Sequence, residues 1–492
     1  MPSTWKPSVE LCSASQETSF AYESTVKRWP TILTGVIDEL SKLNGHLLQP
    51  QDEAKLKESK ALINEIAGLI YEMRHDRELS DIDASAGLPD DVKLYNNVLA
   101  AARAEGKPIK WFNASWLYAD YRRLRAMFAS TVHWRTFDCF ASQKLGAFRS
   151  SATGIYALAR SVQDLVKKGQ PNEQELQADL IKMLAICLWG NATDLSLLTS
   201  FTHEDIQALQ TVERGADFVL KNDFAKVWQH VKTLEKKRID IVLDNSGFEL
   251  YSDLVLGDWL LVSPLLSQTL SPFCSEIVFH PKLIPWFVSD VQPHDFKILL
   301  SSLLDPSFFP SDSGATDEDR QALKAMVERW QSYIGKGVFR LSTPLDLEMG
   351  ASGGEIADFW TGPQAFADLP SDAPELLKEL KKASLVIFKG DLNYVRPFTF
   401  GDHTCAVLNC QIHLTLVSVQ RKLTYDACWP TTTPFEDTLG PLKGEFDILS
   451  LRTCKADVCV GLEEGKADEL DRTDPNWRVS GKYAVVSFVP RS

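Results

Sequence analysis

The C-terminal part of the chain alternates short apolar runs with helical segments, and this alternation limits the fold more than any other feature of the sequence. Strand-like runs begin near Arg238 with RIDIVL, continue with EIVFH and LVIF, and end with YAVVSFV. Between them lie segments such as FELYSDLVLGDWLL, whose length suits a helix. Alternation of strand and helix predicts an α/β layer with a mainly parallel sheet.

The N-terminal part has a different texture. TVKRWPTILTGVIDELSKLNGHL and the segment over residues 52–79 space their apolar residues by threes and fours. That spacing is typical of amphipathic helices, and convincing strands are absent. We therefore predict a helical domain over residues 1–200 and an α/β domain over residues 201–492.

Charge and cysteine content exclude several classes of protein. The 492 residues include 52 Lys and Arg against 66 Asp and Glu, a net charge of −14. Nucleic-acid binding needs clustered basic residues, so none is expected. The nine cysteines form no C-x-x-C pair, which fits reduced thiols better than zinc or disulfides. We expect no signal peptide and no membrane span, because no apolar run is long enough.

Polar side chains follow two of the predicted strands at the point where each strand ends. Asp244 and Asn245 follow RIDIVL, and Asp290 follows PWFVS. In open α/β sheets, ligands bind beyond the carboxyl ends of the strands. Carboxylate and amide oxygens suit Mg²⁺ or Mn²⁺. The alternative is that Asp244 and Asn245 cap the helix that follows them.

Basic side chains follow two other strands. Lys389 ends LVIFK, and Arg452 and Lys455 follow ILSL. Facing a metal ion, they suit a phosphate group, so the set predicts transfer of a phosphoryl group to water. The sequence has no P-loop, no G-x-S-x-G elbow and no second aspartate in DNSG. The lack of a glycine-rich loop counts against dinucleotide or adenosylmethionine binding.

Four motifs together resemble the metal-dependent damage-control phosphatase family. They are LDNSGFELYSDL, IPWFVSDV, FKGDLNY and LRTCKADV. The resemblance is to the eukaryotic branch with an acidic-residue-methyltransferase-like domain, whose Arg-Thr-x-Lys signature is matched by Arg452, Thr453 and Lys455. It spans about residues 18–490. It implies a helical bundle followed by a three-layer α/β/α, Rossmann-like domain.

The resemblance also implies a site and an activity. It places the metal and the catalytic chemistry on Asp244, Asn245 and Asp290, with Asp244 a candidate either to activate water or to attack phosphorus. The family removes phosphate from sugar phosphates such as fructose 1-phosphate, with Mn²⁺, Co²⁺, Ni²⁺ or Mg²⁺. The substrate-binding residues that it implies are Glu249, Lys389, Asp391, Leu392, Asn393, Tyr394, Arg421 and Lys455.

One segment departs from the family pattern, in which D-L-N-Y runs directly into R-K-L. Here residues 395–420 separate the two halves. The segment begins with Val, whose codons begin GT, and ends with Gln, one of whose codons ends AG. We therefore hypothesise a retained intron, with a genuine loop insertion as the alternative. Without the segment, Arg421 follows Tyr394 and joins the phosphate or sugar site.

The sequence thus predicts a metal-dependent phosphatase of sugar phosphates in metabolite damage control. One alternative is a protein-glutamate carboxyl O-methyltransferase using adenosylmethionine, an activity also attributed to this branch. Another is a catalytically impaired interaction protein. The expected partners are small phosphorylated metabolites, with no nucleic acid and no membrane. We expect a monomer in the cytoplasm, with the nucleus as a second compartment.

Overall fold

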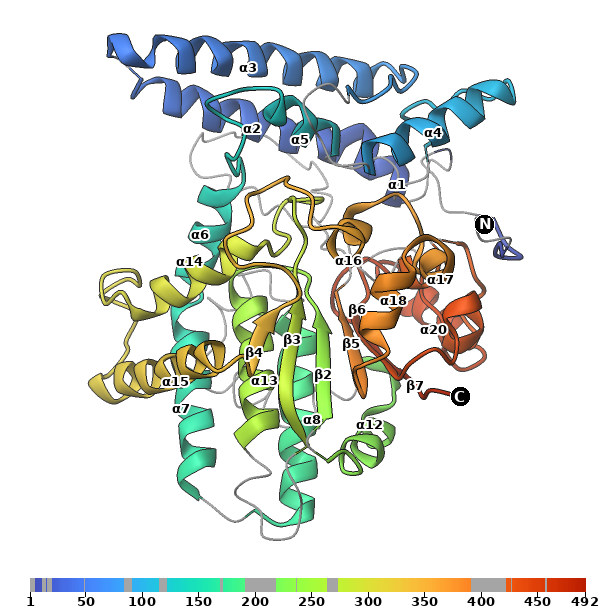
Figure 1. Cartoon of the computed structure of the whole chain (residues 1–492). Coiled ribbons are helices and arrows are strands. Elements are labelled where there is room, and N and C mark those ends of the chain that lie inside the picture. The colour runs from blue at the N-terminus through green and yellow to red at the C-terminus, as the bar shows by residue number, and fades with distance from the viewer. Residues whose placement is uncertain are drawn as a thin grey trace.

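The computed structural model contains a seven-stranded sheet in the order β1-β7-β6-β5-β2-β3-β4 (Figure 1). Strands β4, β3, β2, β5 and β6 are parallel, β7 runs antiparallel to β6, and β1 is parallel to β7. The strands are β1 (Val219–Asn222), β2 (Lys237–Val242), β3 (Cys274–His280), β4 (Phe339–Leu341), β5 (Leu385–Lys389), β6 (Ile448–Thr453) and β7 (Ala484–Val489). The structure describes residues 5–10, 15, 20–47, 49–83, 91–114, 122–168, 171–190, 218–235, 237–262, 273–390, 422–425, 427–455 and 458–492.

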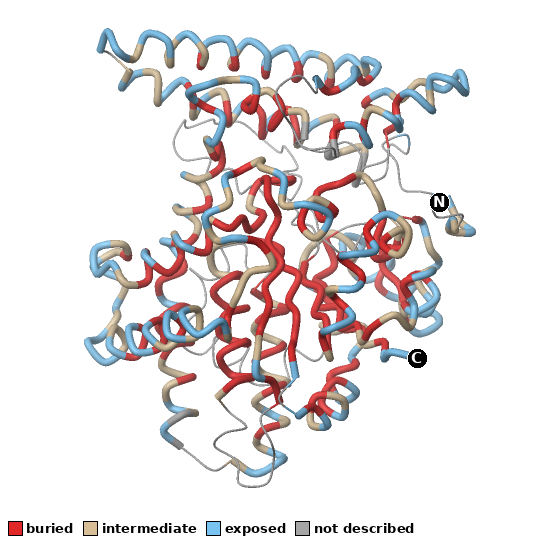
Figure 2. The backbone as a smooth tube through the Cα atoms, in the orientation of Figure 1, coloured by how far each residue is buried: buried red, intermediate tan, exposed pale blue. Residues whose placement is uncertain are grey.

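Helices cover both faces of the sheet. Successive side chains of a strand point to opposite faces, and here both sets are mostly apolar, so each face needs a covering layer. In β5, Leu385 and Ile387 belong to one core, and Val386 and Phe388 belong to another. Strands β2, β5 and β6 are buried along most of their length (Figure 2). The predicted three-layer α/β/α class is therefore confirmed.

The first core, on the side of Ile387, is completed by long helices. They are α7 (Ala152–Lys168), α8 (Glu173–Gly190), α12 (Phe224–Val231), α13 (Phe248–Val262), α14 (Pro293–Leu304) and α15 (Asp317–Gly335). Helix α13 is buried on nearly every side, as expected of a central helix, and its buried residues include Glu249, Asp253 and Asp258 as well as apolar side chains. Helices α7 and α8 precede residue 200, the predicted domain boundary, and pack on the sheet; the division into two domains stays a prediction.

The opposite core contains short helices and turns. They are α16 (Glu355–Asp358), α17 (Leu369–Asp372), α18 (Pro374–Leu380) and the 3₁₀ turns η4 (Phe359–Thr361), η5 (Phe366–Asp368), η6 (Phe435–Thr438) and η7 (Gly440–Leu442). A small separate cluster holds α20 (Lys466–Thr473) against β7.

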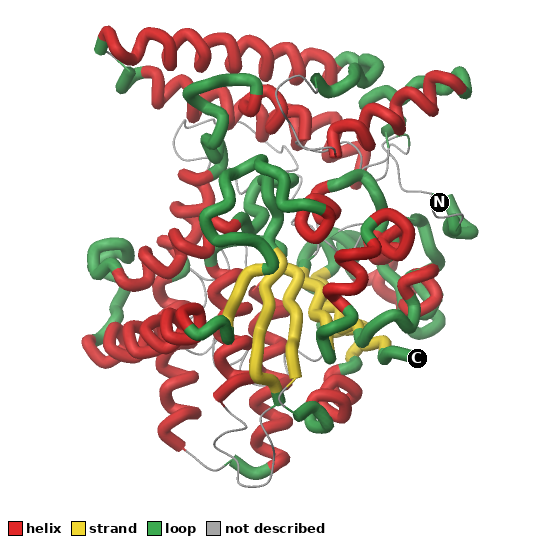
Figure 3. The backbone as a smooth tube through the Cα atoms, in the orientation of Figure 1, coloured by secondary structure: helices red, strands yellow, loops and turns green. Residues whose placement is uncertain are grey.

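A layer of N-terminal helices lies beyond the carboxyl ends of the central strands, with loops between (Figure 3). It contains α1 (Phe20–Glu23), the π-helical turn η1 (Ser24–Arg28), α2 (Trp29–Asn44), the 3₁₀ turn η2 (Pro50–Asp52), α3 (Glu53–Arg74), α4 (Asp91–Ala104) and α5 (Arg122–Ala129), and α6 (Ala141–Ser150) follows it.

The core of this layer includes Trp286 and Phe287 from the loop after β3. Trp286 Nε1 donates to Tyr95 Oη over 3.0 Å, and Tyr95 donates to the carbonyl of Thr361 over 2.9 Å. The N-terminal helices therefore hold the loop that carries Asp290. None of the helices within the described residues is both long and apolar enough to cross a membrane.

Candidate active site

The site lies between β2 and β5, where successive strands of the chain change from one side of β2 to the other. From β2 the chain proceeds through β3 to β4 on one side, whereas β5 and β6 lie on the other. Such a switch point leaves a crevice beyond the carboxyl ends of the two central strands. Asp244 lies two residues after β2, and Gly390 directly follows β5.

Gly390 allows these two strand ends to meet. Its φ is +101°, a conformation that favours glycine. A Cβ at this position would lie 2.0 Å from Asp244 Oδ2 and 2.2 Å from Asp244 Cγ. The carboxylate of Asp244 therefore rests against the Cα of Gly390, and no side chain fits between them.

Backbone and side-chain contacts bring Asp244, Asn245 and Asp290 together, although Asp290 is far away in the sequence. Asn245 and Asp290 form an isolated antiparallel bridge. The amide of Val291 donates to the carbonyl of Asp244 over 2.9 Å. Ser289 Oγ donates to Asn245 Oδ1 over 3.0 Å. The loop after β3 is thus paired with the turn after β2.

The side chain of Asn245 is held in one orientation by two carboxylates. Its Nδ2 donates to Asp244 Oδ2 over 2.8 Å and to Glu249 Oε2 over 2.7 Å. Both donor hydrogens are used, and Oδ1, which accepts from Ser289 Oγ, has a second lone pair for a ligand. Asp290 is fixed as well, because Phe287 donates its backbone N–H to Asp290 Oδ2 over 2.6 Å.

Lys282 supplies a cation to both aspartates. Its Nζ lies 2.5 Å from Asp290 Oδ1 and 3.6 Å from Asp244 Oδ1. Burial by itself lowers the pKa of Lys282, but the two carboxylates outweigh it and raise the pKa above its ordinary value. Burial raises the pKa of Asp290, and Lys282 opposes that rise. Burial also raises the pKa of Asp244 well above its ordinary value, and Glu249 and Asp290 raise it further.

Lys389 supplies a second cation, one layer deeper. Its ammonium lies 3.1 Å from Glu249 Oε1 and 3.0 Å from Asp253 Oδ1, and it donates to the carbonyl of Cys187 over 2.6 Å. Burial raises the pKa of Asp253 to about 7 although Lys389 opposes the rise. Lys389 therefore holds Glu249 from behind, and its predicted contact with substrate stays a prediction.

These linked, buried groups have an excess of negative charge. The carboxylates are Asp244, Glu249, Asp253 and Asp290, and the ammonium groups are Lys282 and Lys389. Four negative and two positive charges leave two negative charges when all six groups are ionised. Buried charges need compensation, and one divalent cation would balance this excess. The donor set therefore fits such an ion.

The remaining predicted residues differ in what the structure describes. Lys455 follows β6 and is buried, with its side-chain carbons against Gly481, where an added Cβ would lie 3.1 Å from Lys455 Cε. Arg452 and Thr453, also buried, end β6. Residues 391–394 and Arg421, like the segment 395–420, lie outside the described residues. All the predicted site roles stay predictions.

A second charged cluster lies behind Asp290. Lys144 of α6 donates to Asp138 Oδ2 over 2.9 Å, to Asp295 Oδ2 over 2.8 Å and to the carbonyl of Asp290 over 3.2 Å. Asp138, His294 and Asp295 each offer a ligand atom, all within 4.8 Å of one another, which matches the spacing of a metal site. However, the ammonium of Lys144 already supplies a cation to both carboxylates.

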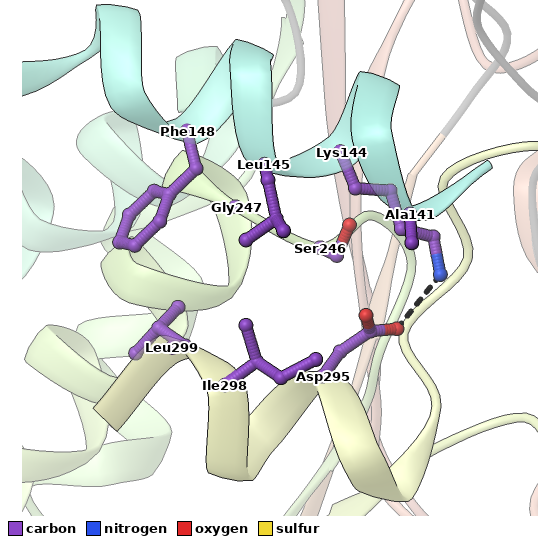
Figure 4. Close-up of a pocket in the computed structure, with 9 residues that line it drawn as sticks. All are labelled: Ala141, Lys144, Leu145, Phe148, Ser246, Gly247, Asp295, Ile298 and Leu299. Atoms are coloured by element: carbon purple, nitrogen blue, oxygen red, sulfur yellow. Dashed lines mark hydrogen bonds and ion pairs between the residues drawn. The ribbon is translucent and has the colours of Figure 1, made fainter. Parts of the chain in front are cut away.

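Figure 4 shows a small cavity beside this second cluster, between α6, α14 and the turn before α13. Its volume is about 20 Å³, which is room for about one water molecule. Lys144, Asp295 and Ser246 form its polar end, and Phe148 and Leu299 lie on its apolar wall. The cavity is too small for a sugar phosphate.

Sequence reasoning missed Lys282, Asp253 and Lys144. Lys282 stands in HPKLIPWFVSD, two residues before the motif IPWFVSDV, in which Asp290 is the one predicted ligand. Asp253 lies four residues after Glu249, and this spacing places both side chains on the same face of a helix. Nothing in the local sequence connects Lys144 with Asp290, which lies 146 residues away.

The fold and the site define a three-layer α/β protein with an acidic centre at the switch point of its sheet. The sequence model of the damage-control phosphatase ARMT1-like domain matches residues 24–399. Damage-control phosphatase ARMT1 of Mus musculus is 31% identical over 494 residues, covering 97% of each chain. The Xenopus laevis protein of that name is 32% identical over 495 residues, covering 97% of this chain and 98% of its own. The chain therefore belongs to the ARMT1-like damage-control phosphatase domain family.

A solved structure of a DUF89 family protein from Pyrococcus horikoshii is also similar, at 15% identity and a TM-score of 0.30. It covers 73% of this chain and 83% of its own. The curated relatives are named as phosphatases, which does not favour the methyltransferase alternative.

Proposed function

We propose that the chain is a metal-dependent phosphatase that hydrolyses phosphate monoesters of small metabolites, with sugar phosphates such as fructose 1-phosphate as the first class to test. The observation that carries this proposal is the meeting of Asp244, Asn245 and Asp290 at the switch point, within a buried cluster of four carboxylates and two ammonium groups. Membership of the damage-control phosphatase family supports it.

A divalent cation, Mn²⁺, Co²⁺, Ni²⁺ or Mg²⁺, would be held by the carboxylates of Asp244 and Asp290 and by Asn245 Oδ1. When bound, such an ion neutralises charge on phosphoryl oxygens and polarises them. The side chains of the chain do the rest. Asn245, itself held by Glu249, orients the carboxylate of Asp244, and Lys389 pairs with Glu249 and holds it in place.

Substrate binding is assigned to residues beyond the same edge of the sheet. Lys455 follows β6, the neighbour of β5, and would bind the phosphate dianion. Arg421 and residues 391–394 would line the sugar. Asp244 is the candidate to act on water or to attack phosphorus, because its carboxylate lies at the switch point beside Asn245 and Asp290.

The segment 395–420 remains a proposed interruption of the substrate loop. Its position supports this, since the match of the family model ends at residue 399, inside the segment. Transcript reads that omit the corresponding nucleotides would support a retained intron, and reads that keep them would refute it.

The test is a phosphate-release screen over sugar phosphates with Mn²⁺. It uses the full chain, a chain without residues 395–420, and Asp244→Asn in both backgrounds. We expect metal-dependent release that Asp244→Asn abolishes. Absence of release from both wild-type forms across the screen would contradict the proposal. Calorimetric titration with adenosylmethionine tests the methyltransferase alternative, for which micromolar binding without metal is expected.

We also propose that the protein is a cytoplasmic monomer, present in the nucleus as well, that acts on free metabolites. Light scattering of the purified chain measures its mass, and a mass near twice 55.1 kDa would refute the monomer. Cell fractionation tests the location.

A further inference from the structure

Lys282 contacts the side chains of both aspartates that we assign to the metal. Its Nζ lies 2.5 Å from Asp290 Oδ1 and 3.6 Å from Asp244 Oδ1, and its side chain is only 3% exposed. The other carboxylate oxygen of each aspartate has a different partner. Asn245 Nδ2 donates to Asp244 Oδ2, and the backbone N–H of Phe287 donates to Asp290 Oδ2. The ammonium thus contacts the Oδ1 atoms of both aspartates, while the protein holds their Oδ2 atoms.

The position of Lys282 is fixed by its backbone. Its N–H donates to the carbonyl of Val291 over 2.9 Å, which closes the loop that carries Asp290. The next residue, Leu283, accepts from the N–H of Gly350 over 2.9 Å. Because the main chain is held on both sides, the ammonium reaches the two carboxylates from a rigid base.

We propose that Lys282 is the built-in counter-ion of the metal site, a positioning residue that holds Asp244 and Asp290 together before a metal binds and weakens their affinity for the metal. Two buried carboxylates that face each other repel, and a cation between them removes the repulsion. The same positive charge repels an incoming divalent ion. The inference rests on the proposed metal site. It adds that the positive charge of Lys282 limits the affinity of this site for a divalent ion.

The two effects predict opposite changes in one variant. In Lys282→Met, the metal-free protein loses its counter-ion, so its melting temperature falls. The affinity for Mn²⁺ rises, since one positive charge beside the ion is gone. We expect the dissociation constant to fall by at least about tenfold, measured near pH 8 so that protons compete little for the carboxylates.

Arg238→Met is the matched control. Arg238 is also a buried cation with two carboxylate partners, Asp240 and Glu379, but it lies at the opposite end of β2. This variant should lower the melting temperature of the metal-free protein without changing the dissociation constant for Mn²⁺. Lys282→Arg, which keeps the charge, should bind Mn²⁺ no more tightly than wild type.

The measurements are calorimetric titration with Mn²⁺ and melting temperature with and without Mn²⁺, both on the full chain. Mn²⁺ should raise the melting temperature of Lys282→Met by more than that of wild type. Binding by Lys282→Met as weak as wild type, or weaker, overturns the inference while leaving the proposed function in place. Absence of Mn²⁺ binding by wild type overturns both. Lys282→Gln carries the same test if the Met variant does not fold.

Discussion

Gly390→Ala should disturb the metal site without removing any of its proposed ligands, which makes it a more specific test than the substitution of a ligand. An added Cβ would lie 2.0 Å from Asp244 Oδ2, and ordinary van der Waals contact begins at 3.4 Å. The Asp244 carboxylate or the end of β5 must therefore move by about 1.4 Å. A displacement of about 1 Å in a catalytic group costs about 100-fold in rate.

We accordingly expect kcat/KM for phosphate release to fall at least about 100-fold in Gly390→Ala, with weaker binding of Mn²⁺. The positive φ adds a stability cost of about 1–3 kcal/mol. Gly337→Ala is the control, because Gly337 has a φ of +70° and a Cβ there would meet nothing within 4 Å. It should show a similar loss of stability on urea unfolding and normal activity. Normal Mn²⁺ affinity in Gly390→Ala would refute the reasoning. So would a fall in kcat/KM in Gly337→Ala as large as that in Gly390→Ala.

Three further outcomes are expected. Lys144→Met should lower the free energy of unfolding in urea by about 3–5 kcal/mol, because two buried carboxylates lose their cation; a loss under about 1 kcal/mol would contradict the role of Lys144. The raised pKa of Asp253, about 7, means that the folded metal-free chain holds this proton more tightly than the unfolded chain, so the contribution of Asp253 to stability is lost as pH rises from about 4 to about 7. Asp253→Asn should flatten this decline in urea unfolding measured across that range, and an unchanged pH dependence would contradict it. Lys455→Met should raise KM for a sugar phosphate about tenfold or more, whereas Lys482→Met, at a half-exposed lysine, should leave KM unchanged.

The strand ends could be predicted from the sequence because one physical rule applies to them. Parallel strands end at a common edge, so Asp244 and Asn245 were expected near Asp290. The prediction of a strand in PWFVS was wrong, because this segment is a loop after β3, which ends at His280, and the loop brings Asp290 back to the strand end. The structure adds how they meet, through the bridge between Asn245 and Asp290 and the fit of Gly390. The fit of Gly390 against Asp244 could not be predicted. It depends on the pairing of β2 with β5, a strand that comes much later in the chain.

Lys389 shows a contact that the strand-end rule does not give, and its predicted role in substrate binding stays a prediction. It is the last residue of β5, and side chains alternate along a strand. Lys389 therefore points to the same face as Leu385 and Ile387, toward α13, where Glu249 and Asp253 lie. The alternation of side chains could be predicted from LVIFK, but the carboxylates that pair with Lys389 come from another element, α13.

Lys282 and Lys144 could not be found by local patterns. A lysine two residues beyond a strand is ordinarily solvated. Lys282 is buried because the N-terminal helices cover its loop, and Lys144 reaches Asp290 from α6, in the part of the chain that was predicted as a separate helical domain. Both depend on tertiary packing.

A crystal of the full chain soaked in Mn²⁺ tests the central claim most directly, because anomalous scattering locates the ion itself. The account predicts a strong peak within coordination distance, about 2.2 Å, of oxygens of Asp244, Asn245 and Asp290. A peak at Asp138, His294 and Asp295 instead, or no peak at either group, would contradict it.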